Sequence, residues 1–89
     1  MEGMRAAVIG VGAMGQHHAR VYNQLSATQL VAVADANAEI GERIAHLYHT
    51  VACVDYCRLL EETRPDVVSI AVPTELHHQV ALDALEAGG

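Results

Sequence analysis

Four runs of consecutive apolar residues are spaced along the chain, and each is short enough to be a single strand. They cover residues 5–10, 29–35, 51–54 and 66–72, and the third is the shortest. Continuous apolar runs of this length, without polar alternation, are typical of strands that are covered on both faces of a parallel sheet. The pattern therefore predicts four buried strands.

Between and after these runs the apolar residues recur at intervals of three and four, which predicts helices. The first helix extends from residue 13 to about 25, and the second follows Asn37, a residue type favoured at helix N-caps. The third covers residues 56–63. Thr74 can cap the fourth. Four groups are predicted to lie on the packed faces of their helices: Met14, His18, Val21 and Leu25; Ile40, Ile44 and Leu47; Leu59 and Leu60; and Leu76, Val80, Ala84 and Ala87.

Strands and helices thus alternate from one end of the chain to the other. This alternation, with right-handed crossovers between parallel strands, predicts an α/β fold. We expect a Rossmann-like doubly wound parallel sheet of about four strands, in the order 3-2-1-4, with helices on both faces. The 89 residues are predicted to form one domain.

Composition narrows the possible functions. The chain has five Lys plus Arg against eleven Asp plus Glu, a net charge of −6, which disfavours nucleic acids and anionic membranes as partners. No run approaches the roughly 18 apolar residues of a membrane span. Cys53 and Cys57 do not suggest a disulfide framework, so we expect free thiols and a cytoplasmic protein. His17 and His18 are adjacent and diverge around a helix, so no metal site is predicted.

A glycine-rich motif, G-x-G-x-x-G, occupies residues 10–15, between the first strand and the first helix. In this context it is typical of a dinucleotide-binding turn. Gly10 would allow the tight turn, Gly12 would let the backbone approach a pyrophosphate, and Gly15 would let the helix approach the sheet. Ala13 and Met14 complete the predicted cofactor-binding turn. The alternative is a structural turn that binds no nucleotide.

Asp35 ends the second predicted strand, twenty residues after Gly15, where a Rossmann unit places a ribose-binding carboxylate. A carboxylate there would repel a 2′-phosphate, so the sequence favours NAD over NADP as the cofactor. Two alternatives stay open. Asp35 can be a turn or capping residue, and Arg43 can reach across to a 2′-phosphate.

Three segments of the chain resemble the Gfo/Idh/MocA oxidoreductases: residues 7–19, 65–78 and 81–88. The resemblance implies a nicotinamide cofactor that oxidises or reduces a hydroxyl on a sugar, an inositol or a related ring. It also implies that four residues lie beside the nicotinamide half of the cofactor: Val72, Pro73, Thr74 and His77. The alternatives are that Thr74 acts only as a helix cap and that His77 is simply solvated.

The family pattern continues beyond residue 89 with a Glu-Lys-Pro motif and a C-terminal sheet domain that holds the substrate. This sequence contains no lysine, so we expect residues 1–89 to be an incomplete NAD(P)-binding domain without catalytic residues of its own. We expect it to bind the cofactor without completing the reaction. The fourth strand would then lie at a sheet edge and favour a homo-oligomer. The alternatives are a standalone dinucleotide-binding module and a structural α/β interaction module.

Overall fold

Strands and helices alternate through the whole of the described chain. The computed structural model describes residues 3–72 and 74–88, without the side chains of residues 13, 74, 75, 87 and 88. In chain order the elements are β1 (Met4–Ile9), α1 (Ala13–Gln24), β2 (Thr28–Ala34), α2 (Ala38–Leu47), β3 (Ala52–Cys53), α3 (Tyr56–Thr63), β4 (Val67–Ile70) and α4 (Thr74–Gly88).

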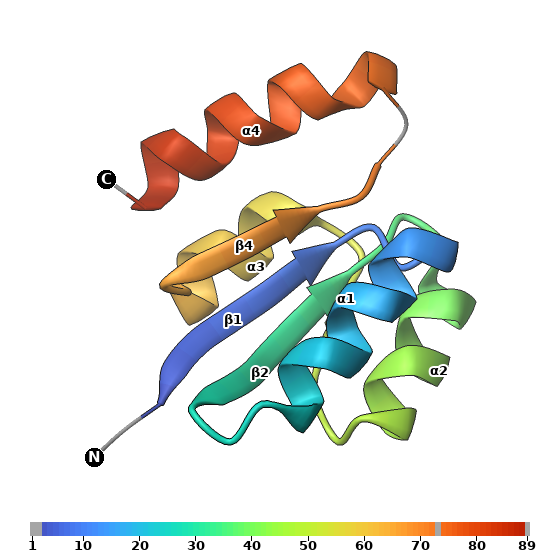
Figure 1. Cartoon of the computed structure of the whole chain (residues 1–89). Helices are drawn as coiled ribbons and strands as arrows, with labels where there is room; N and C mark the ends of the chain where they lie inside the picture. Colours follow the sequence, from blue (N-terminus) through green and yellow to red (C-terminus); the bar gives the residue numbers. More distant parts are fainter. Residues whose placement is uncertain (1–2, 73, 89) are drawn as a thin grey trace.

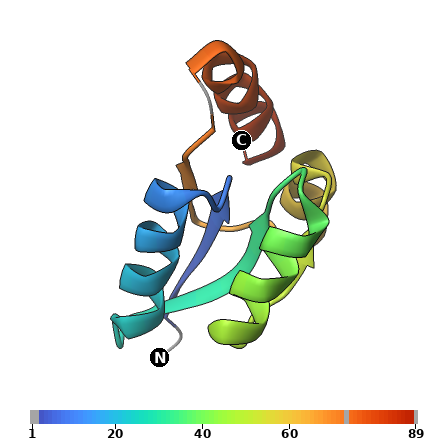
Figure 2. The same cartoon turned by 90° about the vertical axis from the view of Figure 1, so that its right-hand side faces the viewer.

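The four strands form one parallel sheet in the order β3-β2-β1-β4, which confirms the predicted topology. Helices α1 and α2 cover one face, and α3 and α4 cover the other (Figures 1 and 2). Two predicted strands are shorter than expected, since β3 has only two residues and β4 ends at Ile70. Among the described residues, every helix is too short or too polar to cross a bilayer.

The core has two layers, one on each face of the sheet. On the α3 and α4 side, Leu59 is fully buried against Ala7, Ile9 and other strand residues. On the other side, Val8 and Val33 pack against α1 and α2. Ala6 and Ala7 of β1 are fully buried and small, so helices can approach this part of the sheet closely.

The predicted packed face of α1 is wrong. Met14 is 65% exposed and Leu25 is 49% exposed, while Gly15 and Ala19 are buried. The helix lies so close to the β1–α1 turn that only small residues fit between them, and the larger apolar residues point outward. A spacing rule that counts only large apolar residues selects the other side of such a helix.

In two further helices, a large apolar residue that was predicted to pack is exposed. In α2, Ile44 is buried together with Gly41 and Ala45, but Leu47 is 59% exposed, contrary to prediction. In α4, Val80 is buried as predicted, whereas Leu76 is exposed at the mouth of the cleft described below. Ala84 packs on the core, and the side chain of Ala87 lies outside the described atoms. Leu59 and Leu60 of α3 are buried as predicted.

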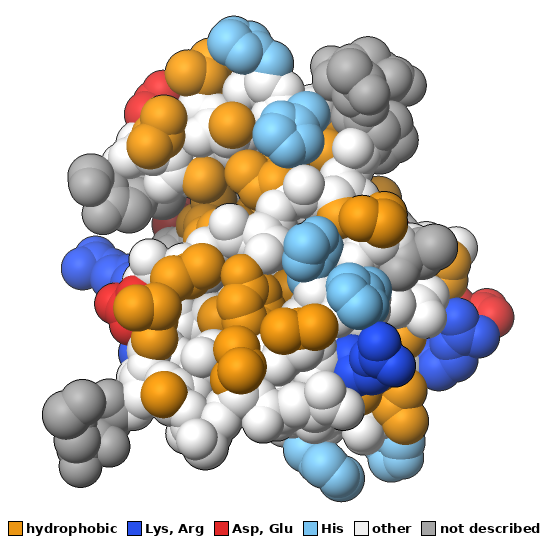
Figure 3. All heavy atoms as spheres, viewed as in Figure 1, with side chains coloured by type: hydrophobic (Ala, Val, Ile, Leu, Met, Phe, Trp, Pro, Cys, Tyr) orange, Lys and Arg blue, Asp and Glu red, His pale blue; other side chains and the backbone are white. Residues whose placement is uncertain are grey.

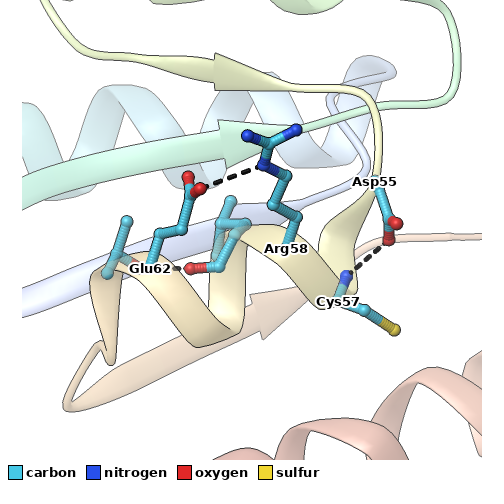
Figure 4. Close-up of polar contacts among 6 residues, drawn as sticks. Asp55, Cys57, Arg58 and Glu62 are labelled. Carbon is cyan, nitrogen blue, oxygen red and sulfur yellow. Dashed lines mark hydrogen bonds and ion pairs between the residues drawn. The ribbon is translucent and has the colours of Figure 1, made fainter.

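Polar side chains define where the helices begin. The side-chain oxygen of Asn37 accepts a hydrogen bond from the Ile40 N–H, 3.2 Å away, so Asn37 is the predicted N-cap of α2. Asp55 caps α3 by accepting a hydrogen bond from the Cys57 N–H, and Arg58 forms an ion pair with Glu62 along the same helix (Figure 4). These contacts set the direction of the chain as it leaves β2 and β3.

Candidate functional site

The carboxyl ends of β1, β2 and β4 meet at one edge of the sheet, beside a cleft of about 340 Å³. From β1 the chain winds outward through β2 to β3, and it then crosses to β4 on the other side of β1. Ligands of doubly wound folds bind where the strand order reverses in this way. The cleft is lined by Ile9, Gly10, Gly12, Ala34, Asp35, Ala36, Val54, Tyr56, Ala71, Val72, Leu76 and Val80.

Two glycines of the motif are required by the fold itself. Gly10 has a φ of +90°, and a Cβ on it would lie 2.6 Å from the carbonyl oxygen of Ala71. A Cβ on Gly15 would lie 1.7 Å from the carbonyl oxygen of Gly10. Gly10 therefore makes the tight turn possible, and Gly15 lets α1 lie directly against that turn.

Gly12 differs from both, because the protein does not need a glycine there. Its φ is −69°, and outside Gly12 and its two chain neighbours no described atom lies within 4 Å of the position that a Cβ would take. It is the N-cap residue of α1, but it makes no side-chain capping bond. The first N–H groups of a helix have no partner within the helix. The open space beside Gly12 thus adjoins amide groups suited to an anion.

Asp35 ties the end of β2 to the glycine turn. Its Oδ2 accepts a hydrogen bond from the Val11 N–H, 2.9 Å away, and its Oδ1 accepts one from the Asn37 N–H, 2.8 Å away. Asp35 therefore acts as a turn residue, which was one of the alternatives considered for it. A carboxylate has about four acceptor positions, so each oxygen keeps room for a further donor in the cleft.

No Lys or Arg is among the described residues that line the cleft. Arg43, considered as a partner for a 2′-phosphate, is exposed on α2 and is not part of this lining. The charged group of the cleft is the Asp35 carboxylate.

The residues expected beside the nicotinamide fall in different places. Val72 lines the cleft. Thr74 begins α4, but its side chain is not described, and Pro73 lies outside the described residues. His77 is exposed in the first turn of α4 and is not among the lining residues, and Met14 is also exposed outside the cleft.

Sequence reasoning missed one wall of the cleft, formed by Val54, Tyr56 and Leu76. The hydroxyl of Tyr56 donates a hydrogen bond to Oδ2 of Asp83 in α4. This hydrogen bond, together with partial burial, raises the pKa of Tyr56 above its ordinary range. An aromatic residue at the start of the helix that follows the third strand is the one sequence signal for this wall.

Cysteine and metal chemistry are not favoured in the described part of the chain. Both cysteines are free thiols, and burial together with nearby carboxylates raises the pKa of Cys53 and of Cys57. Raised pKa values keep the thiols protonated, unlike those of activated nucleophiles. Among residues 3–72 and 74–88, no three His, Cys, Asp or Glu residues are grouped to hold a metal ion.

The family model for an oxidoreductase family with an NAD-binding Rossmann fold matches residues 4–89. This chain belongs to the Gfo/Idh/MocA family. The glycine turn, Asp35 and the cleft at the strand crossover are therefore parts of the family's NAD-binding Rossmann fold.

Similar Gfo/Idh/MocA proteins include named dehydrogenases. UDP-N-acetylglucosamine 3-dehydrogenase from Acidithiobacillus ferrooxidans is 42% identical over 85 residues, which are 96% of this chain and 26% of that protein. A solved structure of that enzyme superposes with a TM-score of 0.88 at 41% identity, covering 99% of this chain and 28% of the other. Inositol 2-dehydrogenase 4 from Saccharopolyspora erythraea is 33% identical over 87 residues, 96% of this chain and 26% of the relative. The chain spans about a quarter of the length of these curated relatives.

Proposed function

We propose that this chain binds NAD as the cofactor-binding part of a dehydrogenase that acts on a hydroxyl of a sugar, an inositol or a related ring. Membership of the Gfo/Idh/MocA family supports the cofactor, and the named relatives support the substrate class. The single observation that carries the proposal is Gly12, a glycine beside open space at the start of α1. Gly12 is also the N-cap residue of α1, and the missing Cβ leaves room for a pyrophosphate close to the backbone.

The chemistry of the cleft lining and the family resemblance together support one arrangement of the cofactor. The pyrophosphate would accept hydrogen bonds from the first amide groups of α1, beside Gly10 and Gly12. The adenosine ribose would donate its hydroxyl hydrogens to Asp35. The nicotinamide would lie toward the end of β4, near Val72, Pro73, Thr74 and His77. When bound, NAD supplies the hydride acceptor, and the residues of this chain position it.

Asp35 supports NAD rather than NADP. A 2′-phosphate would add negative charge next to a carboxylate that is already held in place by two backbone N–H groups. The described lining offers no Lys or Arg to compensate for that charge. We therefore propose NAD as the preferred cofactor.

Replacing Asp35 with Asn should shift this preference toward NADP. The amide keeps one oxygen for the Val11 or Asn37 N–H but removes the charge that repels the 2′-phosphate. We expect the affinity ratio of NAD to NADP to fall at least about tenfold, measured by calorimetric titration with both cofactors.

Asp66→Asn is the matched control for this experiment. Asp66 also accepts a backbone hydrogen bond, from the Arg5 N–H at 2.9 Å, but it precedes β4 and is not part of the cleft lining. Its variant should keep the wild-type ratio. An unchanged ratio in Asp35→Asn would contradict the proposed role of Asp35, and no heat with either cofactor in the wild-type chain would contradict the proposed function.

We also propose that the chain assembles with a second copy through β4, in the cytoplasm. β4 forms an edge of the described sheet, and apolar side chains gather over β4 and β1 beside it (Figure 3). Unpaired apolar edges favour pairing with another strand. The two free thiols suit a reducing compartment such as the cytoplasm.

Sedimentation velocity should show a dimer or larger species that increases with protein concentration. A single monomeric boundary at every concentration would contradict assembly.

A further inference from the structure

Tyr56 and Asp83 connect two helices that pack on the same face of the sheet. Tyr56 begins α3, directly after the capping residue Asp55, and it lines the cleft. Asp83 lies in the middle of α4, 27 residues away, and accepts the Tyr56 hydroxyl at 2.5 Å. Both side chains are half-buried. One hydrogen bond therefore connects the cleft-lining Tyr56 of α3 to the neighbouring helix α4.

Asp83 is itself held in position by its own helix. The Nε2 of Gln79 donates to Oδ1 of Asp83 at 3.0 Å, so the two carboxylate oxygens have different partners. Among the described residues, the side-chain hydrogen bonds between α3 and α4 all end on Asp83, from Tyr56 and from Cys57. The apolar attachment of α4 rests on Val80 and Ala84, while Leu82 and Leu85 are exposed. The Tyr56 bond adds a directional contact between α3 and α4 to this apolar attachment.

The strand order shows which part of a dinucleotide would lie at this wall. Along the carboxyl edge of the sheet, the glycine turn follows β1, Asp35 follows β2, and Val54 and Tyr56 follow β3. A pyrophosphate at the turn and a ribose at Asp35 would direct the adenine ring toward Val54 and Tyr56. The lining there is apolar apart from the Tyr56 hydroxyl, which is turned to Asp83.

We infer that Tyr56 and Asp83 act together as positioning residues, fixing the side of the cleft formed by Val54 and Tyr56, against which the adenine ring of the cofactor packs. This inference rests on the proposed function. In this arrangement neither residue would lie beside the nicotinamide. Their effect is on the affinity for the adenosine half, because a wall that is already in place needs no ordering when the ligand binds.

The test is calorimetric titration of the whole chain with NAD⁺ and with ADP-ribose. Tyr56→Phe and Asp83→Ala should each lower the affinity for both ligands by the same factor, about three- to tenfold. The double variant should bind both ligands with the same affinity as the single variants, because each change removes the Tyr56–Asp83 hydrogen bond. Asp83→Asn keeps an acceptor oxygen and should keep affinity close to that of the wild type.

Tyr22→Phe is the matched control. The Tyr22 hydroxyl bonds to Oγ of Ser69 at 2.6 Å, between α1 and β4, and Tyr22 packs on the opposite face of the sheet. Loss of one hydroxyl bond should lower the Tm of Tyr22→Phe and Tyr56→Phe alike, by about 4–8 °C. Only Tyr56→Phe should lose affinity, which separates positioning from general stability.

An independent readout is the ultraviolet absorbance of tyrosinate during an alkaline titration. The wild-type chain should contain a tyrosine that ionises above the ordinary range, and Asp83→Ala should lack it. If the wild type binds both ligands and Tyr56→Phe binds them as well as Tyr22→Phe does, the inference is overturned while the proposed function stands. A loss of affinity for NAD⁺ but not for ADP-ribose in Tyr56→Phe also overturns the inference. Failure of the wild type to bind either ligand overturns both.

Discussion

Replacing Gly15 with alanine should unfold the chain. The new Cβ would lie 1.7 Å from the carbonyl oxygen of Gly10 and 2.7 Å from its carbonyl carbon, both backbone atoms that cannot rotate away. Gly10 cannot move away from the new Cβ. Its N–H donates a hydrogen bond to the Ala34 carbonyl at 2.6 Å, and its Cα packs against the backbone of Ala71. We expect a loss of at least about 3 kcal/mol in the free energy of unfolding, the upper range for an overpacked site.

Denaturant unfolding followed by circular dichroism measures this effect. Gly41→Ala is the matched control, since Gly41 is also a buried helix glycine, but its Cβ would meet only Ala52 and Asp35 side-chain carbons at 3.7 and 3.8 Å. That ordinary contact, together with the better helix propensity of alanine, should stabilise the chain by about 1 kcal/mol. Equal stability of the two variants would show that α1 does not lie against the turn as described.

The strand order and the glycine turn could be predicted because their signals are local. Each buried strand is one apolar run, and the helices between the runs leave few ways to join parallel strands. The spacing of Gly10, Gly12 and Gly15 lies within six residues. Nothing distant in the sequence is needed to recognise such features.

The packed face of α1 and the wall of the cleft formed by Val54, Tyr56 and Leu76 could not be predicted in the same way. The packed side of α1 depends on how closely the helix approaches the turn, a distance set by Gly15 and Gly10 together. Tyr56 and Asp83 are 27 residues apart in different helices, and no periodicity relates them. The hydrogen bond from the Val11 N–H to Asp35 likewise depends on the position of Val11 after folding. These features arise from tertiary contacts.

Gly12→Ala should leave the fold intact and abolish cofactor binding. Outside residue 12 and its two chain neighbours no described atom lies within 4 Å of the new Cβ, and a φ of −69° suits any residue. Alanine is a somewhat poorer N-cap than glycine, but it also restricts the unfolded chain. These effects offset each other, so we expect stability within about 1 kcal/mol of the wild type.

The methyl group of Gly12→Ala would instead occupy the space proposed for the pyrophosphate. We expect at least a 100-fold loss of NAD affinity, or about 3 kcal/mol, by calorimetric titration of a chain whose circular dichroism is unchanged. Gly12→Ala and Gly15→Ala make the same chemical change three residues apart in one motif. Gly12→Ala should keep the fold and lose cofactor binding, whereas Gly15→Ala should lose the fold itself. NAD binding by a stably folded Gly12→Ala chain with wild-type affinity would mean that the cofactor does not approach this turn.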